Sequence, residues 1–238
     1  MRRALLPLVL GFAATLAVTA SADDKPAAPP PPAAPEPKLQ SLPPEKVAAS
    51  VTRVQAFYDK TQFFASEFTQ EFWVKAYNQK RVSKGKVTIA KPGRMHWHYD
   101  EPKDNRVVSD GATVKVYEHA NRQMYEQQVD KSQYPAALSF LTGTGKLSET
   151  FNFELFPGDK MAFPGGEVLV GVPKVPTPAY SKVLFYVDSQ TAQIRRVLII
   201  DAQGNRNRFD FTNPAVNQPV SQEFFRFVPP PGTQIVRP

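Results

Sequence analysis

One stretch of the sequence decides the predicted fold. It reads Lys91-Pro92-Gly93-Arg94-Met95-His96-Trp97-His98-Tyr99-Asp100-Glu101-Pro102 and resumes as Val107-Val108-Ser109-Asp110-Gly111. Pro-Gly and Asp-Gly are strong turn signals, so the residues between them form strands of a hairpin. Because side chains alternate along a strand, Met95, Trp97 and Tyr99 share one face. The stretch therefore displays a wide aromatic strip on one side of a sheet.

The same alternation extends over most of the chain. Phe64, Phe68 and Phe72 share one face of a strand that begins near Gln62. Residues 77–86 are polar and are interpreted as a turn. Further strands are predicted at 87–90, 114–117, 124–129, 151–156, 167–172, 181–187, 193–201, 207–211 and 222–228. About ten short strands favour an antiparallel sheet that closes into a barrel, splits into a sandwich or stays open over an apolar concave space.

Two segments interrupt the β pattern. Pro43-Pro44-Glu45 is typical of a helix start, and Val47, Val51 and Val54 follow at helical spacing in a helix that ends near Lys60. The second segment, residues 134–143, contains Leu138, Phe140 and Leu141 and ends at a glycine. Strands flank this insert on both sides, so the two helical segments are candidates for a lid over the sheet.

The first 44 residues are expected to lie outside the folded domain. Arg2 and Arg3 precede an apolar run, and Ala20-Ser21-Ala22 is a small-residue cleavage site. These features predict a secretory signal peptide over residues 1–22. Residues 23–44 form a Pro/Ala-rich tract that has little to bury in a core and is predicted to be a disordered linker. The folded domain is then expected over residues 45–238.

Composition excludes several classes of protein. The chain has no cysteine, so lipid-modified cysteine, thiol nucleophiles and cysteine-based metal sites are all excluded. Loss of Arg2 and Arg3 with the leader lowers the formal charge from +7 to +5, and the basic residues show no nucleic-acid motif. We therefore expect neither a nucleic-acid partner nor a membrane anchor in the mature protein.

No catalytic constellation is recognisable. The chain lacks a Gly-x-Ser-x-Gly elbow, a phosphate-binding glycine loop and a His-Glu-x-x-His motif. His96 and His98 project from the same strand face, which would suit a metal pair, but we interpret them as polar residues on a solvent face. The predictions are that the protein is not an enzyme, holds no metal and needs no cofactor.

The order of these motifs resembles a known family. Phe68-Thr69-Gln70 follows the helix, Lys91-Pro92-Gly93 and Trp97-His98-Tyr99-Asp100-Glu101-Pro102 come next, and Phe225-Arg226-Phe227-Val228-Pro229-Pro230-Pro231-Gly232-Thr233 closes the chain. This combination is similar to the periplasmic outer-membrane lipoprotein carriers, the LolA family, over about residues 42–236. The resemblance implies an unclosed antiparallel β half-barrel with helices over its apolar concave face.

The resemblance also implies a function. Such a carrier receives acylated lipoproteins from an inner-membrane lipoprotein-releasing ABC transporter and delivers them to an outer-membrane receptor. It is periplasmic, and we expect a monomer. The alternative is a related half-barrel that binds lipid or lipoprotein as a sensor or regulator of the cell envelope.

Residue roles follow from the same resemblance. Lys91 matches the family position whose basic side chain bonds backbone carbonyls of the lid, and Arg94 is the second candidate for this latch. The residues expected to line the acyl-chain cavity are Phe68, Phe72, Met95, Trp97, Tyr99, Leu138, Phe140 and Leu141. The tail after Thr233 is short, so the final strand of some carriers is expected to be missing.

Overall fold

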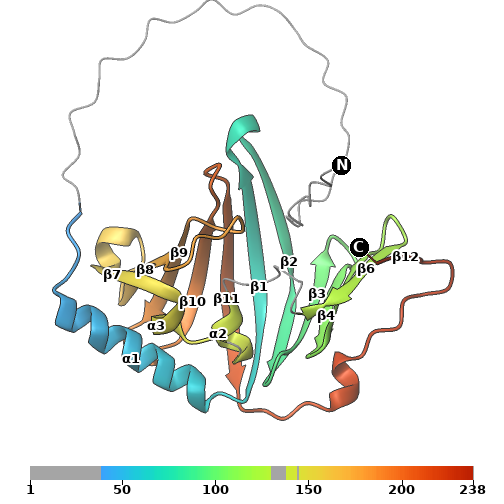
Figure 1. Cartoon of the computed structure of the whole chain (residues 1–238), viewed down its shortest axis with the longest axis horizontal. Helices are drawn as coiled ribbons and strands as arrows, with labels where there is room; N and C mark the ends of the chain where they lie inside the picture. The colour runs from blue at the N-terminus through green and yellow to red at the C-terminus, as the bar shows by residue number, and fades with distance from the viewer. Residues whose placement is uncertain (1–38, 130–137, 144, 238) are drawn as a thin grey trace, which may run out of the picture.

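A single open sheet of 12 strands organises the molecule (Figure 1). The computed structural model describes residues 39–129, 138–143 and 145–237. The strands lie in the order β12-β6-β5-β4-β3-β2-β1-β11-β10-β9-β8-β7. Neighbours pair antiparallel except for β12 and β6, which are parallel. The prediction of an unclosed β half-barrel is thus confirmed, with the correction that the sheet is mixed at one edge.

The strand bounds show where the curvature arises. The strands are β1 (Phe63–Val74), β2 (Gln79–Ala90), β3 (Arg94–Glu101), β4 (Arg106–Asp110), β5 (Thr113–Glu118), β6 (Gln123–Gln128), β7 (Phe151–Pro157), β8 (Gly166–Pro173), β9 (Lys182–Asp188), β10 (Ile194–Ile200), β11 (Arg206–Val216) and β12 (Gln234–Val236). The two longest, β1 and β2, form the central hairpin of the sheet. Register shifts in the pairing of β1 with β11 and of β2 with β3 interrupt the ladder on both sides of this hairpin and increase its bend.

Three helices lie on the concave face of the described sheet (Figure 1). They are α1 (Pro44–Lys60), α2 (Ser139–Thr142) and α3 (Leu147–Thr150). Helix α1 begins at the predicted Pro-Pro-Glu segment, where proline suits the first turn and Glu45 complements the helix dipole. It buries Val51, Val54 and Tyr58 against the sheet. The helical lid that the sequence predicts is therefore present, with α2 and α3 beside α1.

The chain's C-terminal segment covers part of the convex face. After β11 it runs through a 3-10 helix, η5 (Gln222–Phe225), and across β3 and β4 to reach β12 (Figure 1). Phe225 is buried there, and the carbonyl of Phe224 lies 2.9 Å from Nδ1 of His96. The strand predicted at 222–228 is wrong, since these residues form η5 and irregular backbone. His96 consequently lies beneath this segment and not on an open solvent face.

Two other local predictions are corrected by the structure. The polar residues 79–86 belong to β2, where each of them pairs with a residue of β1. Only a short 3-10 turn, η1 (Lys75–Tyr77), joins the two strands. The final strand is also present: Ile235 pairs with Met124 in a parallel β12–β6 ladder. This strand begins at Gln234, after prolines 229–231.

The start of the described chain is already attached to the domain. The amide of Leu42 donates to the carbonyl of Leu155 in β7 at 2.7 Å, and Pro44 lies in α1. The last residues assigned to the linker therefore contact the sheet. The predicted signal peptide, and the linker up to residue 38, lie outside the described residues. No helix in the described part of the chain is long and apolar enough to cross a membrane.

Gly85 permits the close approach of β2 and β3 at the bulge. A Cβ atom at this position would lie 2.0 Å from the backbone oxygen of His98, a contact that no side-chain movement relieves. We predict that Gly85→Ala lowers the free energy of unfolding by about 1–3 kcal/mol, the usual cost of overpacking. Urea unfolding measures the effect, and Ser83→Ala on the same strand is the control that should change stability little.

Candidate functional site

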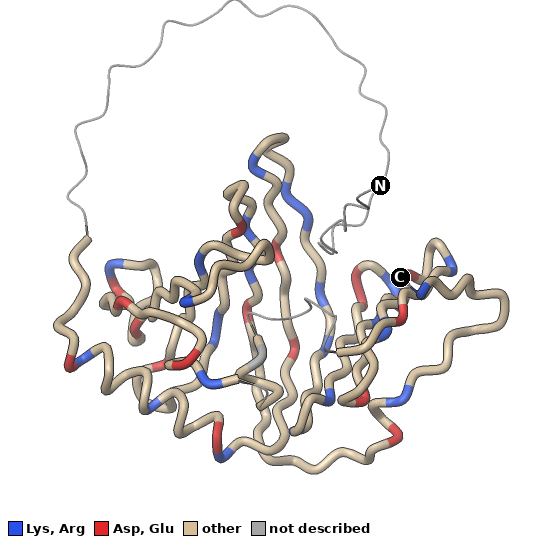
Figure 2. Tube along the Cα trace, in the orientation of Figure 1, with Lys and Arg blue, Asp and Glu red and all other residues tan. Residues whose placement is uncertain are grey.

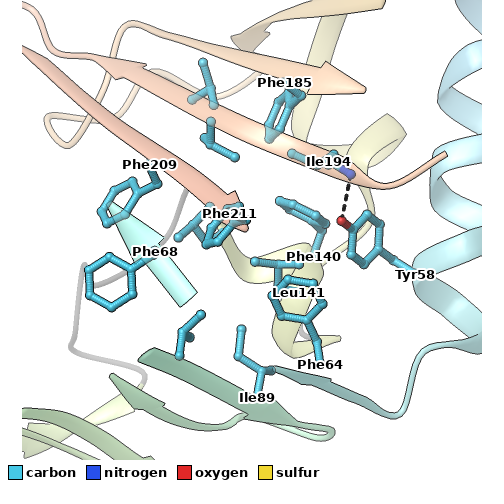
Figure 3. Close-up of a cluster of buried hydrophobic side chains, with 14 of the residues drawn as sticks. Tyr58, Phe64, Phe68, Ile89, Phe140, Leu141, Phe185, Ile194, Phe209 and Phe211 are labelled. Atoms are coloured by element: carbon cyan, nitrogen blue, oxygen red, sulfur yellow. Dashed lines mark hydrogen bonds between the residues drawn. The ribbon is translucent and has the colours of Figure 1, made fainter. Parts of the chain in front are cut away.

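One apolar cluster fills the space between the lid and the concave face (Figure 3). It contains seven of the eight predicted cavity residues: Phe68, Met95, Trp97, Tyr99, Leu138, Phe140 and Leu141. Phe140 of α2 packs edge-on against Tyr58 of α1 and Phe185 of β9, with ring centroids 4.9 and 5.6 Å apart. The structure thus joins side chains from both helices and from distant strands in one water-excluded volume.

Trp97 is fully buried in this cluster. Its side chain is 0% exposed, and its ring contacts Phe68 and Phe209 with centroids 4.9 and 5.4 Å apart. Within the described residues, its indole Nε1 is buried with no hydrogen-bond partner. An unpaired buried donor costs about 1–3 kcal/mol. The unpaired Nε1 of Trp97 therefore lowers the stability of the core, which an apolar side chain at this position would not do.

Polar side chains border the apolar cluster on the side that is nearest the tip of the β1–β2 hairpin. The hydroxyl of Tyr99 donates to Oε1 of Gln70 at 3.1 Å, and Nε2 of Gln70 donates to Oδ1 of Asn207 at 2.9 Å. Phe72 lies beyond this polar boundary and is only partly buried. Of the predicted cavity residues, Phe72 is the one that the structure places outside the cluster.

Lys91 joins the sheet to the lid. Its ammonium donates to the carbonyl of Tyr58 in the last turn of α1, and its aliphatic chain lies against Gly143 after α2. Burial lowers the pKa of Lys91 from its ordinary value, and the nearby Asp59 partly opposes this shift. Keeping the ammonium charged here carries a desolvation cost, which the bond to Tyr58 offsets. The contact is therefore a polar attachment between the sheet and the last turn of α1.

Arg94, the second candidate for the latch, has other contacts. Its guanidinium donates to the carbonyl of Lys91 at 2.8 Å and lies over the ring of Phe225, 5.6 Å from the centroid. Both contacts place Arg94 on the convex side of the sheet, where it supports the turn that carries Lys91. Neither of these contacts joins Arg94 to α1.

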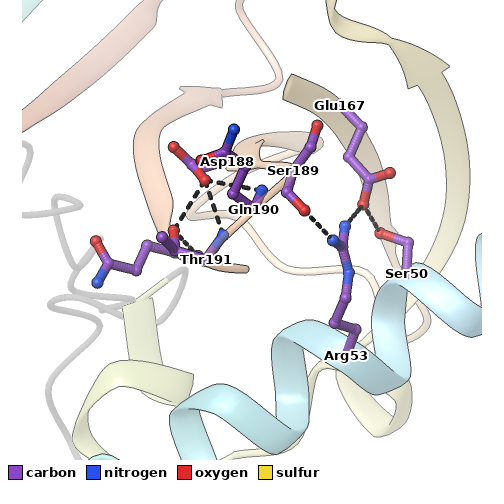
Figure 4. A network of polar contacts seen from close by, with 8 residues as sticks. Ser50, Arg53, Glu167, Asp188, Ser189, Gln190 and Thr191 are labelled. Carbon is purple, nitrogen blue, oxygen red and sulfur yellow. Dashed lines mark hydrogen bonds and ion pairs between the residues drawn. The ribbon is translucent and has the colours of Figure 1, made fainter. Parts of the chain in front are cut away.

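A second polar attachment holds the other side of α1 (Figure 4). Arg53 contacts Oε1 of Glu167 in β8 at 2.5 Å and donates to the carbonyl of Ser189 at 2.6 Å. The hydroxyl of Ser50 donates to the same carboxylate oxygen. Asp188 shapes the neighbouring turn by accepting from the amides of residues 190 and 191. Polar contacts thus hold α1 over the sheet at two separated points.

Two openings flank the lid. A cleft of about 430 Å³ adjoins Lys91 and is lined by Gln55, Asp59, Lys91, Phe140, Gly143, Gly145, Lys146 and Glu149. A more apolar groove of about 730 Å³ lies between the first half of α1 and strand β7, where Val51, Phe151 and Phe153 form part of its wall. Val51 and Phe151 also belong to the central cluster. Both openings therefore adjoin side chains that lie under the lid.

The residues that sequence reasoning missed lie on elements far apart in the chain. Tyr58 shares α1 with the predicted apolar positions, but its hydroxyl accepts from the amide of Ile194 at 3.0 Å, a contact that no local pattern reveals. Arg53 and Glu167 are 114 residues apart. By contrast, Phe209 and Phe211 are two positions apart in β11. This spacing predicts that both lie on one face of the sheet, the face that carries Phe68.

The described residues offer no sign of a metal centre. No group of three or more His, Cys, Asp or Glu side chains among them could hold a metal ion. The two neighbouring histidines, His96 and His98, have ring centroids 6.4 Å apart on the convex face. The features that stand out are an apolar cluster, a helical cover and two polar attachments.

These features define a class: an open β half-barrel that keeps an apolar concave face beneath helices. Comparison with solved structures agrees on the fold. An uncharacterized conserved protein from Thermus thermophilus matches with a TM-score of 0.51 and 12% identity over 81% of this chain and 99% of that one. At this identity the likeness concerns the fold alone.

Comparison with protein families gives the membership. The model for the outer membrane lipoprotein carrier protein LolA matches residues 59–228. The chain therefore belongs to the LolA family. The outer-membrane lipoprotein carrier protein of Pseudomonas putida (strain W619) is 30% identical over 79% of this chain and 86% of that protein. The one from Nitrosomonas europaea is 23% identical over 82% and 93%, respectively.

The bond between Tyr58 and Ile194 allows a test of how the lid is held. Burial raises the pKa of Tyr58, so the hydroxyl stays neutral and continues to accept from Ile194. Tyr58→Phe leaves that buried amide unpaired, and we expect the free energy of unfolding to fall by about 1–3 kcal/mol. Urea unfolding provides the measurement. Tyr77→Phe, at an exposed position, is the matched control. Equal stabilities of the two variants would show that this hydrogen bond does not hold α1.

Proposed function

We propose that the protein is a periplasmic carrier of lipoproteins. It receives an acylated lipoprotein that an ABC transporter releases from the inner membrane, holds the acyl chains between the lid and the concave face, and delivers them to a receptor at the outer membrane. Family membership supports this role, since related proteins bear the name outer-membrane lipoprotein carrier protein. The protein part of the cargo remains outside the half-barrel.

The observation that carries the proposal is the makeup of the cluster under the lid. Each buried methylene group contributes about 0.8 kcal/mol, so long acyl chains require a dry surface of this kind to cross water. The cluster offers aliphatic and aromatic side chains from the lid and from many strands. Such walls bury hydrocarbon without recognising the attached protein, which suits lipoproteins that share lipid and differ in protein.

Trp97 supplies a second argument. Its buried Nε1 has no hydrogen-bond partner in the described structure, whereas the ester carbonyl of an acyl chain is a good acceptor. A carbonyl that reaches Trp97 would remove the cost of the unpaired donor. The site thus has one polar group suited to the linkage region of an acylated cargo, surrounded by apolar side chains suited to its hydrocarbon.

Loading requires the lid to move, because the cluster fills the space beneath it. The apolar contacts that α1 and α2 lose can be replaced by contacts with acyl chains. The polar attachments Lys91–Tyr58 and Arg53–Glu167 have no such replacement in hydrocarbon. They consequently favour the empty, closed state over the loaded state. This difference makes the affinity reversible and assists release at the receptor.

Complex formation is the decisive experiment. The purified protein is incubated with spheroplasts that carry a labelled lipoprotein, and the soluble fraction is analysed by size exclusion. We expect a soluble complex of one carrier with one lipoprotein. A folded protein that releases nothing would contradict carriage. If it binds acylated peptide but never extracts a lipoprotein, the sensor or regulator function takes its place.

The two tryptophans permit a direct test of where the acyl chains bind. In a Trp73→Phe variant, Trp97 is the remaining indole, and we expect its fluorescence to change when an acylated peptide is added. In the matched Trp97→Phe variant, Trp73 reports from the outer side of β1, and its fluorescence should stay constant. Since the chain contains two tryptophans, each variant has a single reporter. A response from Trp73 alone would place the cargo elsewhere.

The proposed latch predicts a separation of loading from release. Lys91→Leu removes a charge-assisted bond of about 1.5–3 kcal/mol that favours the empty state. We expect this variant to load a lipoprotein normally but to transfer it to an acceptor membrane about tenfold less completely. Lys146→Leu is the control, because Lys146 lines the same cleft and is exposed. Equal transfer by both variants would remove Lys91 from the mechanism.

A further inference from the structure

One projecting hairpin of the sheet carries a local excess of basic residues. The outer part of the β1–β2 hairpin, residues 71–86, is here called the arm, and it rises beyond the neighbouring strands (Figure 1). It carries Lys75, Lys80, Arg81, Lys84 and Lys86 against a single acidic residue, Glu71. The arm therefore contributes +4 to a whole-chain formal charge of +7. Figure 2 shows blue, basic segments along the hairpin that stands highest in the view.

Neighbouring strands add further positive charge on the convex side. Arg206 lies over the ring of Trp73, 5.0 Å from its centroid, and Arg208 contacts Glu71 at 3.2 Å. Lys80 also contacts Glu71, at 2.5 Å. One carboxylate is thus shared by two cations, and the guanidinium of Arg206 is stacked on an aromatic ring. Arg208 also contacts Asp210 at 2.8 Å, and Lys84 lies 3.9 Å from Glu101. The five basic residues of the arm, with Arg206 and Arg208, still outnumber the three carboxylates that pair with them, Glu71, Glu101 and Asp210.

Large apolar groups are exposed on the same projection. Tyr77 at the tip is 75% exposed, and Val82 on β2 is 47% exposed. The tip is nonetheless held in place, because Nε1 of Trp73 donates to Asn78 at 3.1 Å and the amide of Lys75 donates to Asn205 at 3.0 Å. Folded backbone thus presents Tyr77 to solvent at a tip that also carries Lys75. Tyrosine with basic neighbours is typical of segments that lie at a membrane–water interface.

We propose that the arm docks the protein on an anionic membrane surface. Basic clusters bind acidic headgroups through charge, and an aromatic ring at the tip adds insertion into the headgroup region. Register places Lys80 and Lys84 on the convex side of the hairpin and Arg81 on the opposite side. A lipid surface can surround such a projection and contact both sides.

A protein partner fits this surface less well. Protein interfaces have a core that is depleted in charged residues and surrounded by a polar rim. The arm has the reverse arrangement, because its basic residues follow its length, with Lys80, Lys84 and Lys86 on the convex side and Arg81 on the opposite side. The proposal also concerns a surface that lies apart from the apolar cluster. It stands or falls independently of the cargo.

The test is sedimentation of the purified protein with lipid vesicles. The probe vesicles contain phosphatidylcholine with about one third phosphatidylglycerol, and the comparison vesicles contain phosphatidylcholine alone. We expect binding to the anionic vesicles at about 50 mM salt and its loss at about 500 mM, because salt screens exposed charges. Equal binding to both kinds of vesicle, or to neither, would overturn the proposal.

Variants locate the effect on the arm. In one variant, Lys75, Lys80, Arg81 and Lys84 are all replaced by Gln. In the control variant, Lys46, Lys60, Lys103 and Lys160, which are exposed elsewhere, are replaced by Gln. Both lose the same charge, yet we expect the arm variant alone to lose at least about tenfold in affinity for anionic vesicles. Equal losses would show that net charge acts without the arm.

Tyr77→Ser separates insertion from charge. We expect a smaller loss of binding than in the arm variant, because the ring contributes apolar contact and no charge. Lipoprotein loading from detergent solution should be normal in all these variants, since they lie outside the apolar cluster. If vesicle binding is unchanged in the arm variant while transfer between membranes fails, the arm contacts a protein partner and the membrane proposal is wrong.

Discussion

The structure depends on one constraint: the concave face of the sheet is apolar and must be kept from water. Side chains such as Trp97, Phe185 and Phe209 are fully or almost fully buried on this face. Each would cost about 1.5–3 kcal/mol to expose. A sheet that closed into a barrel would bury them permanently. An open sheet needs a cover, and α1 with α2 provides it.

The cover is held by two kinds of contact that differ in what can replace them. Apolar contacts between lid and sheet are strong in sum but chemically interchangeable with hydrocarbon. Polar contacts at Lys91 and at Arg53 are few, and hydrocarbon cannot replace them. In the proposed carrier this division would keep the closed form stable and still let acyl chains replace the apolar contacts. The strands supply the shape of the concave face, and the helices supply its cover.

Much of the fold was predictable because alternation is local. The aromatic strip of β3, the helix start at Pro44 and the half-barrel all follow from short patterns or from the family resemblance. The errors have physical causes as well. Residues 79–86 are polar because both sides of the projecting hairpin meet solvent, so composition suggested a turn where pairing forms a strand. Phe225 and Phe227 suggested a strand, yet they pack on the convex face outside any strand.

The makeup of the apolar cluster was predictable from the sequence, whereas the polar contacts at its border were not. Seven of the eight chosen side chains meet in one cluster because the strand period places them on one face. Glu167 and Ser50 carry no such signal, since a polar contact across the fold depends on the final arrangement of distant elements. Lys91 was found through the family resemblance, and the structure gives its partner as the carbonyl of Tyr58.

The two ends of the described chain have a consequence for self-association. An open sheet has two outer strands whose free amides and carbonyls can pair with another molecule. Here Leu42 pairs with Leu155 beside β7, while β12 lies along β6 and leaves only a three-residue strand outermost. Each outer edge is thus occupied by a segment near one end of the described chain. Removing either segment would therefore expose backbone amides and carbonyls of the next strand. These groups could pair with a second molecule and begin fibre-like stacking.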